Sequence, residues 1–333
     1  MTEITVILPV YNRIDQTILT LDKLLLSDNL GVDFVLEIII SDASPYNLLN
    51  SKLPKESAYS KIVYTKPSIQ GIAASKNHAA SLAKNPIIIF CDSDIEVERK
   101  TISCTLSYLK KNPTVAMLGG QVQWKGGPKD KELDRPRTED KTHSSQNNTC
   151  YIESLYSRYI ATYRDIFLKV GGYDQEVFNM RGEGSDLSVR YWRDGFPLGF
   201  SEDIFVEHIH EVEGGIIRNV EEPELDIAKD MLLLAYKYDM FDQGYDNFKD
   251  TINANFSSFH DSANTKIIRG ILKNYEFICK SKSALDSFKL NDKSKYDFKF
   301  LEIFSNSNEL DQCLSRAERL ISPYWKLAFN ETS

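Results

Sequence analysis

The chain has 333 residues, of which 42% are hydrophobic and 26% are charged, and its formal net charge is −8. This composition is typical of a globular protein with enough residues for one large domain or two ordinary ones. The negative charge disfavours a broad nucleic-acid surface, which would need a basic stripe, but it does not exclude a local basic groove. No apolar run approaches the roughly 18 residues that span a bilayer, so we expect no transmembrane segment.

The cysteines and the first residues bear on the compartment. The five cysteines are odd in number and widely spaced, without a C-x-x-C pair, so neither a disulfide framework nor a structural zinc site is indicated. The chain starts almost directly with an apolar run and shows no basic leader or cleavage site. We therefore expect a soluble cytoplasmic protein, and leave open a peripheral attachment at the inner face of the membrane.

The first half of the chain alternates between strand and helix patterns. Runs of β-branched and apolar residues predict strands over 4–10, 34–40, 61–64, 86–91 and 115–122. Apolar residues at helical spacing predict helices over 14–26, 72–83 and 101–111. This alternation predicts an α/β fold with a mostly parallel, Rossmann-like central sheet and helices on both faces. Ligands of such sheets bind beyond the carboxyl ends of the strands.

The second half begins with a long polar segment, 125–148, which we expect to be a functional loop that orders when ligand binds. A helix is predicted over 185–192 and a last strand over 199–209. The rest of the chain is aromatic-rich, and its apolar residues predict helices over 225–238, 265–279, 298–304 and 309–321. We therefore expect two parts, an α/β domain over 1–215 and a mainly helical C-terminal region over 216–333.

An acidic triplet, Asp92-Ser93-Asp94, directly follows one of the predicted strands. Alternate residues of a strand point to the same side, so the two carboxylates can converge on one ligand. Oxygen ligands suit a hard divalent cation, and such a cation suits a diphosphate. Asn12 and Asp42 follow other predicted strands, so one crevice should collect them all. Because neither a dinucleotide fingerprint nor a P-loop is present, the pattern favours another kind of nucleotide-using enzyme.

Several motifs occur in one order along the chain. They are Leu8 to Arg13, Glu37 to Asp42, Gly71 to Asn77, Asp92 to Asp94, Gly171 to Asp174, Gly182 to Leu187 with Arg190, and His208. Together they resemble the family-two glycosyltransferases, which are inverting enzymes with the GT-A fold. The resemblance covers roughly residues 3 to 212, and the helical tail carries no signature of the family.

The resemblance implies a nucleotide-sugar donor, usually a UDP-sugar, with Mn²⁺ or Mg²⁺ on its diphosphate, and a glycan or glycoconjugate acceptor. It implies that the donor is bound by Pro9, Tyr11, Asn12, Asp42, Gly71, Lys76, Asp92, Ser93 and Gly172. For the metal it implies Asp92, Asp94 and His208, with His210 as the alternative to His208. The region 216–333 would then serve the acceptor or assembly.

The resemblance implies that the catalytic base belongs to an acidic motif. Many relatives have the sequence G-E-D-x-[DE] there and use one of its acids as the base. Here Gly184 stands in place of the second acid, and the remaining carboxylates are Glu183 and Asp186. We favour Glu183 as the base and keep Asp186 as the alternative. Blander roles are open for two other residues: Lys76 as a solvated helix lysine, and Trp124 as a core residue instead of a sugar-stacking one.

Other functions are compatible with acids of this kind. A sugar nucleotidyltransferase also places a metal near nucleotide phosphates, but it should show a glycine-rich basic loop, which Leu8 to Arg13 lacks. A glycoside hydrolase uses two carboxylates, but it does not explain the acidic triplet. Gly184 leaves open a non-catalytic assembly subunit that binds a sugar nucleotide.

Overall fold

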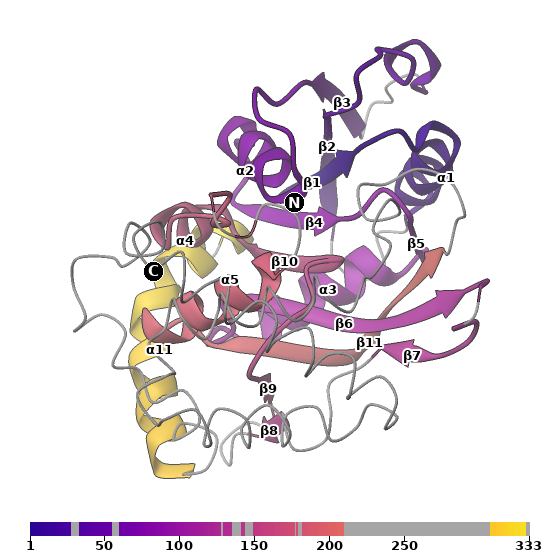
Figure 1. Ribbon diagram of the computed structural model, residues 1–333. Helices are drawn as coiled ribbons and strands as arrows, with labels where there is room; N and C mark the ends of the chain where they lie inside the picture. Colours follow the sequence, from indigo (N-terminus) through magenta and orange to yellow (C-terminus); the bar gives the residue numbers. More distant parts are fainter. Residues whose placement is uncertain are drawn as a thin grey trace, which may run out of the picture.

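The computed structural model describes residues 1–27, 33–54, 60–127, 129–134, 141–143, 149–176, 178, 182–209 and 307–330. An eleven-stranded sheet runs through the described part, in the order β3-β2-β1-β4-β10-β6-β11-β9-β8, with β5 paired to β11 and β7 paired to β6. Helices flank this sheet (Figure 1). The predicted α/β class is confirmed.

The first four strands of the sheet order are parallel, and all but the outermost of them are deeply buried. They are β3 (Ser60–Thr65), β2 (Phe34–Asp42), β1 (Thr2–Val10) and β4 (Ile87–Cys91). Every residue of β4 is buried, which explains why its sequence is a continuous apolar run without alternation. Each isoleucine buried in this way contributes roughly 1.5–3 kcal/mol, so these strands form the stable base of the site.

The second half of the sheet contains strands of both directions. Strand β10 (Tyr159–Tyr163) lies between β4 and β6 (Met117–Lys125) and is antiparallel to both. Strand β11 (Leu198–Ile209) is parallel to β6, so the long strands other than β10 all run one way. The mostly parallel sheet is therefore confirmed. The short strands are β5 (Ile95–Val97), β7 (Leu133–Asp134), β8 (Lys141–His143) and β9 (Cys150–Ile152).

Four of the following helices begin and end close to their predicted limits, whereas the short helix over 164–169 was not predicted from the sequence. The helices are α1 (Ile14–Leu25), α2 (Ile72–Leu82), α3 (Thr101–Lys111), α4 (Arg164–Lys169) and α5 (Glu183–Arg193), with a 3₁₀ turn η1 at Asn50–Lys52. Helix α2 packs on β1 and β2. It is rich in alanine, and the small buried side chains let it lie close to the sheet.

Helix α11 (Ser307–Phe329) is the part of the C-terminal region that the structure describes. Leu310, Leu314 and Ile321 lie on one buried stripe of it, and the indole of Trp325 donates to the carbonyl of Leu109, 3.2 Å away. The expected helices over 225–238, 265–279 and 298–304, and the domain boundary near 215, lie outside the described residues. No helix within the described ranges is long and apolar enough to cross a membrane.

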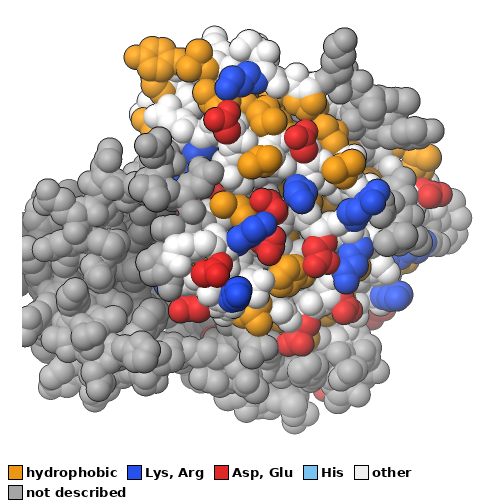
Figure 2. Space-filling model, turned by 90° about the vertical axis from the view of Figure 1, so that its right-hand side faces the viewer, with side chains coloured by type: hydrophobic (Ala, Val, Ile, Leu, Met, Phe, Trp, Pro, Cys, Tyr) orange, Lys and Arg blue, Asp and Glu red, His pale blue; other side chains and the backbone are white. Residues whose placement is uncertain are grey.

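The long strands that run in the common direction end on the same face of the molecule. Figure 2 shows that face, where lysine and arginine side chains intermingle with aspartate and glutamate across the middle. The register pairs Val10 of β1 with Asp42 of β2, so these strand ends lie side by side. The single crevice expected at the carboxyl ends therefore has its framework here.

Candidate active site

The acidic triplet forms a turn whose backbone is held from three directions. The N–H of Asp92 donates to the carbonyl of Arg158 at 2.8 Å, and the carbonyl of Asp94 accepts from the N–H of Ile209 at 2.9 Å. The hydroxyl of Thr20, on α1, donates to the carbonyl of Ser93 at 3.0 Å. These bonds fix the turn between β10, β11 and α1, so its two carboxylates have set positions.

The carboxylate of Asp94 contacts an imidazole and a guanidinium. His208 Nε2 lies 3.2 Å from Asp94 Oδ2, and the guanidinium of Arg13 forms an ion pair with the same oxygen. Burial by itself would raise the pKa of Asp94, but the hydrogen bond and charge of His208, followed by the charge of Arg13, outweigh it and lower the pKa to about 2. Asp94 is therefore held as a carboxylate.

The pair of Asp94 and His208 fits a divalent cation. Two ligands at right angles on an octahedral ion, each at about 2.1 Å, stand about 3 Å apart. The separation of 3.2 Å between His208 Nε2 and Asp94 Oδ2 matches that geometry. No cluster of three or more His, Cys, Asp or Glu side chains suited to a metal occurs among the described residues. A cation here would have this pair as protein ligands and take its other ligands from phosphates and water, as Mg²⁺ commonly does.

The carboxylate of Asp92 forms an ion pair with Lys76. Lys76 Nζ lies 2.9 Å from Asp92 Oδ1, donates to the carbonyl of Ser157 at 2.8 Å and lies 3.9 Å from Glu183 Oε1. The side chain of Lys76 is completely buried. The solvated-lysine reading of this residue is therefore wrong: α2 delivers the ammonium into the interior of the site, where it sits between two carboxylates.

Glu183 opens helix α5 beside that ammonium. Gly182 before it has a φ of +74°, a left-handed conformation that favours glycine. The carboxylate of Glu183 accepts a hydrogen bond from the hydroxyl of Ser157 and is nearly buried. The first turn of a helix favours a negative charge. Glu183 is thus an ionisable carboxylate with a fixed orientation inside the site.

Gly184 is explained by the path of the backbone next to it. A Cβ at this position would lie 2.9 Å from the carbonyl oxygen of Leu155 and 3.2 Å from the nitrogen of Ser157. The segment that presents Ser157 to Glu183 therefore occupies the space of a side chain. The glycine follows from packing and does not by itself indicate a lost activity.

Asp186 lies in a different environment from Glu183. Its carboxylate is fully buried and accepts from Arg190 Nε at 2.9 Å and from Nη2 at 2.6 Å. Arg190 also donates to the carbonyl of Val170 at 2.8 Å. Both bonds from Arg190 to the carboxylate reach the same oxygen, Asp186 Oδ2, and the ion pair connects α5 to the turn that contains Gly171 and Gly172.

The loops after β1, β2 and β3 join at Ser44. Its hydroxyl accepts from the N–H of Asn12 at 2.8 Å, and its own N–H donates to Asp42 at 2.9 Å. The hydroxyl of Tyr64 donates to the other oxygen of Asp42 at 2.8 Å, and burial, followed by the bond to Asp42 and its charge, raises the pKa of Tyr64. Asp42 is almost fully buried beneath these loops.

The remaining residues predicted to bind the donor lie near the end of β1, just before α2, and in a turn that contacts α2. Pro9 is buried near the end of β1, Tyr11 is half-buried, and Gly71 precedes α2 with a φ of +131°. Gly172 has a φ of +67°, and a Cβ on it would lie 2.7 Å from Asn77 Oδ1. Glycine at 172 therefore serves both the turn and its close contact with α2.

Two residues of the site were not assigned a role from sequence. Arg13 ends the motif that begins at Leu8, yet only its reach across to Asp94 shows what it contacts. Ser157 lies in no motif, and no sequence signal points to it. Trp124 packs its ring against His208, with centroids 4.3 Å apart, but it is only half-buried and lies outside the hydrophobic core, so sugar stacking stays a prediction. His210 lies outside the described residues.

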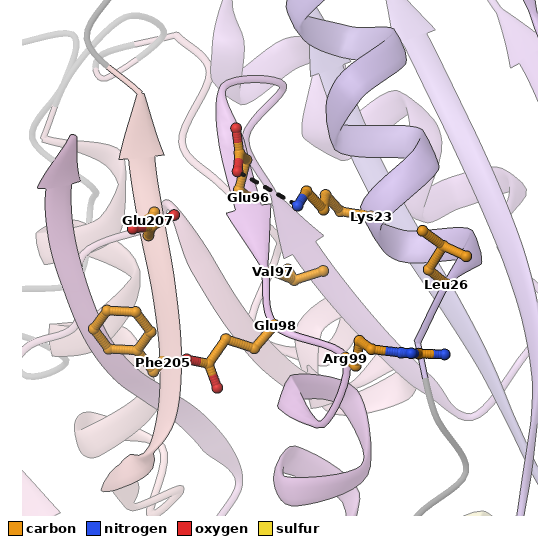
Figure 3. A pocket seen from close by; sticks show the side chains of 8 residues that line it. All are labelled: Lys23, Leu26, Glu96, Val97, Glu98, Arg99, Phe205 and Glu207. Carbon is orange, nitrogen blue, oxygen red and sulfur yellow. Dashed lines mark ion pairs between the residues drawn. The ribbon is translucent and has the colours of Figure 1, made fainter. Parts of the chain in front are cut away.

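A cavity of about 430 Å³ lies beside the site, on the strands that carry Asp94 and His208 (Figure 3). Glu96 and Glu207 line it together with Lys23, which lies 3.8 Å from Glu96. Its lining includes none of the predicted site residues. We therefore describe the site by its contacts and not by this cavity.

Comparison with known proteins agrees with this geometry. The model of the family described as "Glycosyl transferase family 2" matches residues 5–171. No match was found among curated proteins. Among solved structures, S. aureus TarS residues 1–349 in complex with UDP-GlcNAc is similar with a TM-score of 0.55 and 14% identity, over 97% of this chain and 91% of that one.

Two further structures are similar. The mannosyltransferase PcManGT from Pyrobaculum calidifontis, in complex with GDP-Man and Mn²⁺, has a TM-score of 0.54 and 16% identity, over 99% of this chain and 88% of that one. GalNAc-T7 with UDP, GalNAc and Mn²⁺ has a TM-score of 0.52 and 17% identity over 70% of this chain, which spans only 47% of that protein. At these identities the likeness shows the fold, and the expected GT-A fold is confirmed.

Proposed function

This chain belongs to glycosyl transferase family 2, and from that premise we propose that it is an inverting glycosyltransferase. It would transfer a hexosyl or N-acetylhexosaminyl group from a nucleotide-sugar, a UDP-sugar first among the candidates, to a hydroxyl of a glycan or glycoconjugate. The observation that carries this proposal is the separation of tasks around the acidic triplet. Asp94 with His208 provides a place for a cation, and Asp92 is linked through Lys76 to Glu183.

On the leaving-group side, Asp94 and His208 would hold Mn²⁺ or Mg²⁺. Such an ion, when bound, neutralises the charge that a departing diphosphate gains. Two of the similar structures, PcManGT and GalNAc-T7, contain Mn²⁺ together with GDP-Man or UDP. Trp124 supports this side because its ring fixes the imidazole of His208.

On the acceptor side, Glu183 is our candidate for the base. The acceptor oxygen forms a bond to the anomeric carbon, the bond from that carbon to the diphosphate oxygen breaks, and the proton of the hydroxyl passes to Glu183. Attack opposite to the leaving group inverts the anomeric centre. Asp186 is the weaker candidate, because its carboxylate is already bound twice by Arg190.

The donor's nucleoside would lie over the joined loops after β1, β2 and β3. Asp42, Asn12 and Tyr11 are positioned there, with the Gly71 and Gly172 backbones shaping the neighbouring wall. Lys76 does not suit a direct contact with base or phosphate, because its ammonium is buried among protein oxygens. We propose instead that it orients Asp92 and Glu183.

The proposal also covers the roles of the two regions of the chain and the alternative functions. We assign 1–215 to the GT-A catalytic domain and 216–333 to an acceptor or assembly role, in cytoplasmic polysaccharide synthesis. The alternative of a non-catalytic assembly subunit rested on Gly184, which packing explains. A sugar nucleotidyltransferase stays the second enzyme hypothesis, and its product, a sugar nucleotide plus pyrophosphate, separates it in an assay.

A thermal-shift screen tests the donor. We expect UDP-sugars, more than GDP-, CMP- or dTDP-sugars, to raise the melting temperature, and only when Mn²⁺ or Mg²⁺ is present. Stabilisation should disappear in Asp94→Asn and persist in Glu183→Gln, whereas UDP release in the presence of acceptor should disappear in both. A screen in which no sugar nucleotide shows a metal-dependent shift would refute the proposal.

A further inference from the structure

Each carboxylate of the acidic triplet is paired with a cation of the chain itself. Asp92 is paired with Lys76, and Asp94 is paired with Arg13. The two pairs differ in their surroundings. The side chain of Lys76 is 0% exposed and is also bound to the carbonyl of Ser157, whereas that of Arg13 is 16% exposed. Lys76 is thus an interior part of the fold, and Arg13 borders on solvent.

The backbone of Arg13 is anchored independently of its side chain. Its carbonyl accepts the N–H of Thr17 at 3.0 Å in the first turn of α1, and Asn12 before it has a φ of +53°. The guanidinium extends from this anchor, at the end of β1, to the triplet after β4. A long side chain on a fixed backbone can change its partner by rotating about its own bonds, without movement of the strand.

The oxygen that Arg13 occupies is the one that faces His208. Arg13 Nη1 and His208 Nε2 both contact Asp94 Oδ2. A divalent cation between Asp94 and His208 would therefore stand within a few ångströms of the guanidinium. Like charges this close together repel each other even near the protein surface, so the guanidinium and the metal ion compete for this oxygen.

We propose that Arg13 is a resident counter-ion of Asp94 that leaves this carboxylate when a divalent cation binds, and that the released guanidinium then contacts the diphosphate of the nucleotide. This inference rests on the proposed function and adds a role for Arg13. Guanidinium groups match phosphate oxygens with two parallel donors, so the released side chain has a suitable new partner. Each negative group then has a cationic partner, since the metal replaces Arg13 on Asp94 and the diphosphate receives Arg13.

The inference has a measurable consequence for binding order. In the wild type, the metal alone must displace Arg13, whereas with nucleotide present the displaced guanidinium gains a partner. Mn²⁺ and UDP should therefore bind cooperatively, and the coupling should depend on Arg13. A coupling of this kind typically changes affinity by about 5- to 150-fold.

The test measures binding of Mn²⁺ alone, by calorimetry or by the electron paramagnetic resonance signal of free Mn²⁺. In Arg13→Gln we expect the Kd for Mn²⁺ to fall by about fivefold or more, and the Kd for UDP at saturating Mn²⁺ to rise by a similar factor. Arg13→Lys, which keeps the charge, should stay near the wild type for Mn²⁺. Arg164→Gln is the matched control, because it removes the same charge from an arginine that pairs with Asp165 on α4.

The outcomes distinguish this inference from the proposed function. If the wild type binds Mn²⁺ but Arg13→Gln binds it equally or more weakly, the role of Arg13 is overturned and the glycosyltransferase proposal stands. If Arg164→Gln tightens Mn²⁺ as much as Arg13→Gln does, the effect is one of net charge, and the inference also fails. If neither the wild type nor any Arg13 variant binds Mn²⁺ even when UDP is present, both proposals fail. Should Arg13→Gln not fold, Arg13→Met decides, and a Kd for Mn²⁺ that does not fall in this variant would overturn the role of Arg13.

Discussion

Lys76 Nζ lies 3.9 Å from Glu183 Oε1, and both side chains contact Ser157. This arrangement places a buried positive charge between the candidate base and the first acid of the triplet. Buried charges are stable only with partners, and breaking a buried pair costs about 3–5 kcal/mol, because the remaining charge is left uncompensated. The lysine therefore couples the stability of the fold to the geometry of the site.

Replacing Lys76 should lower the stability of the folded protein. In Lys76→Met we expect the free energy of unfolding to fall by about 3–5 kcal/mol, because Asp92 and Glu183 lose their shared counter-ion. Urea denaturation measures this change. The control is Lys61→Met, whose exposed lysine lies 3.7 Å from Glu37 and should contribute less than about 1 kcal/mol. Equal losses in the two variants would contradict the role of Lys76.

The two candidate acids of α5 should respond differently to removal of their charge. Glu183→Gln should lower kcat by about 10²- to 10⁴-fold while UDP affinity and melting temperature stay near the wild type. Asp186→Asn should instead destabilise the fold by about 3–5 kcal/mol, because Arg190 is left buried without its carboxylate. A folded Glu183→Gln enzyme with normal kcat would transfer the role of base to another group.

An acid introduced at Gly184 should not improve the enzyme. The Cβ of Gly184→Asp would approach the carbonyl of Leu155 to 2.9 Å, so the backbone that presents Ser157 must shift. We expect a loss of about 1–3 kcal/mol in stability and a lower kcat. Thermal denaturation and UDP release measure both. Gly184→Ala separates sterics from charge, and an active, stable Gly184→Asp variant would show that the position is open.

Lowering the pH should reduce the free energy of unfolding, because Asp94 takes up a proton. Its pKa falls from the ordinary 3.8 to about 2, because His208 and Arg13 outweigh the effect of burial. A carboxyl whose pKa is lower in the folded state stabilises that state at any pH above its pKa in the unfolded chain. This stabilisation is lost as the pH falls through the pKa of the folded state. The loss should amount to about 2 kcal/mol between pH 4 and pH 2. Asp94→Asn should show a shallower decline of unfolding free energy over this window, and parallel pH curves for the two proteins would argue against the pairing.

The sequence predicts those features of the fold that depend on local patterns. The continuous apolar run of β4 predicts a buried strand, and the acids that follow it predict a site at its carboxyl end, as the structure has them. Strand β10 has five buried residues, so periodicity cannot reveal that it enters antiparallel between β4 and β6. The sheet order follows from tertiary packing, which local periodicity does not encode.

In the candidate site, too, some features could be predicted from the sequence and others could not. Asp94 and His208 are assigned from sequence, and the structure brings them to 3.2 Å. The environment of Lys76 could not be predicted, because its contact with Ser157 joins residues far apart in the chain. Gly184 is also explained only by a neighbour from another segment. Sequence motifs thus identify many of the chemical groups, while their partners require the folded chain.

The antiparallel insertion of β10 also affects how this protein is made on the ribosome. The apolar edge of β4 finds its partner only when Tyr159–Tyr163 has emerged, roughly seventy residues after β4 itself. At about 5–20 residues per second, that edge stays open for several seconds of synthesis. A nascent chain in this interval presents an unpaired hydrophobic strand, which is the kind of surface that chaperones bind and that aggregates when they are scarce.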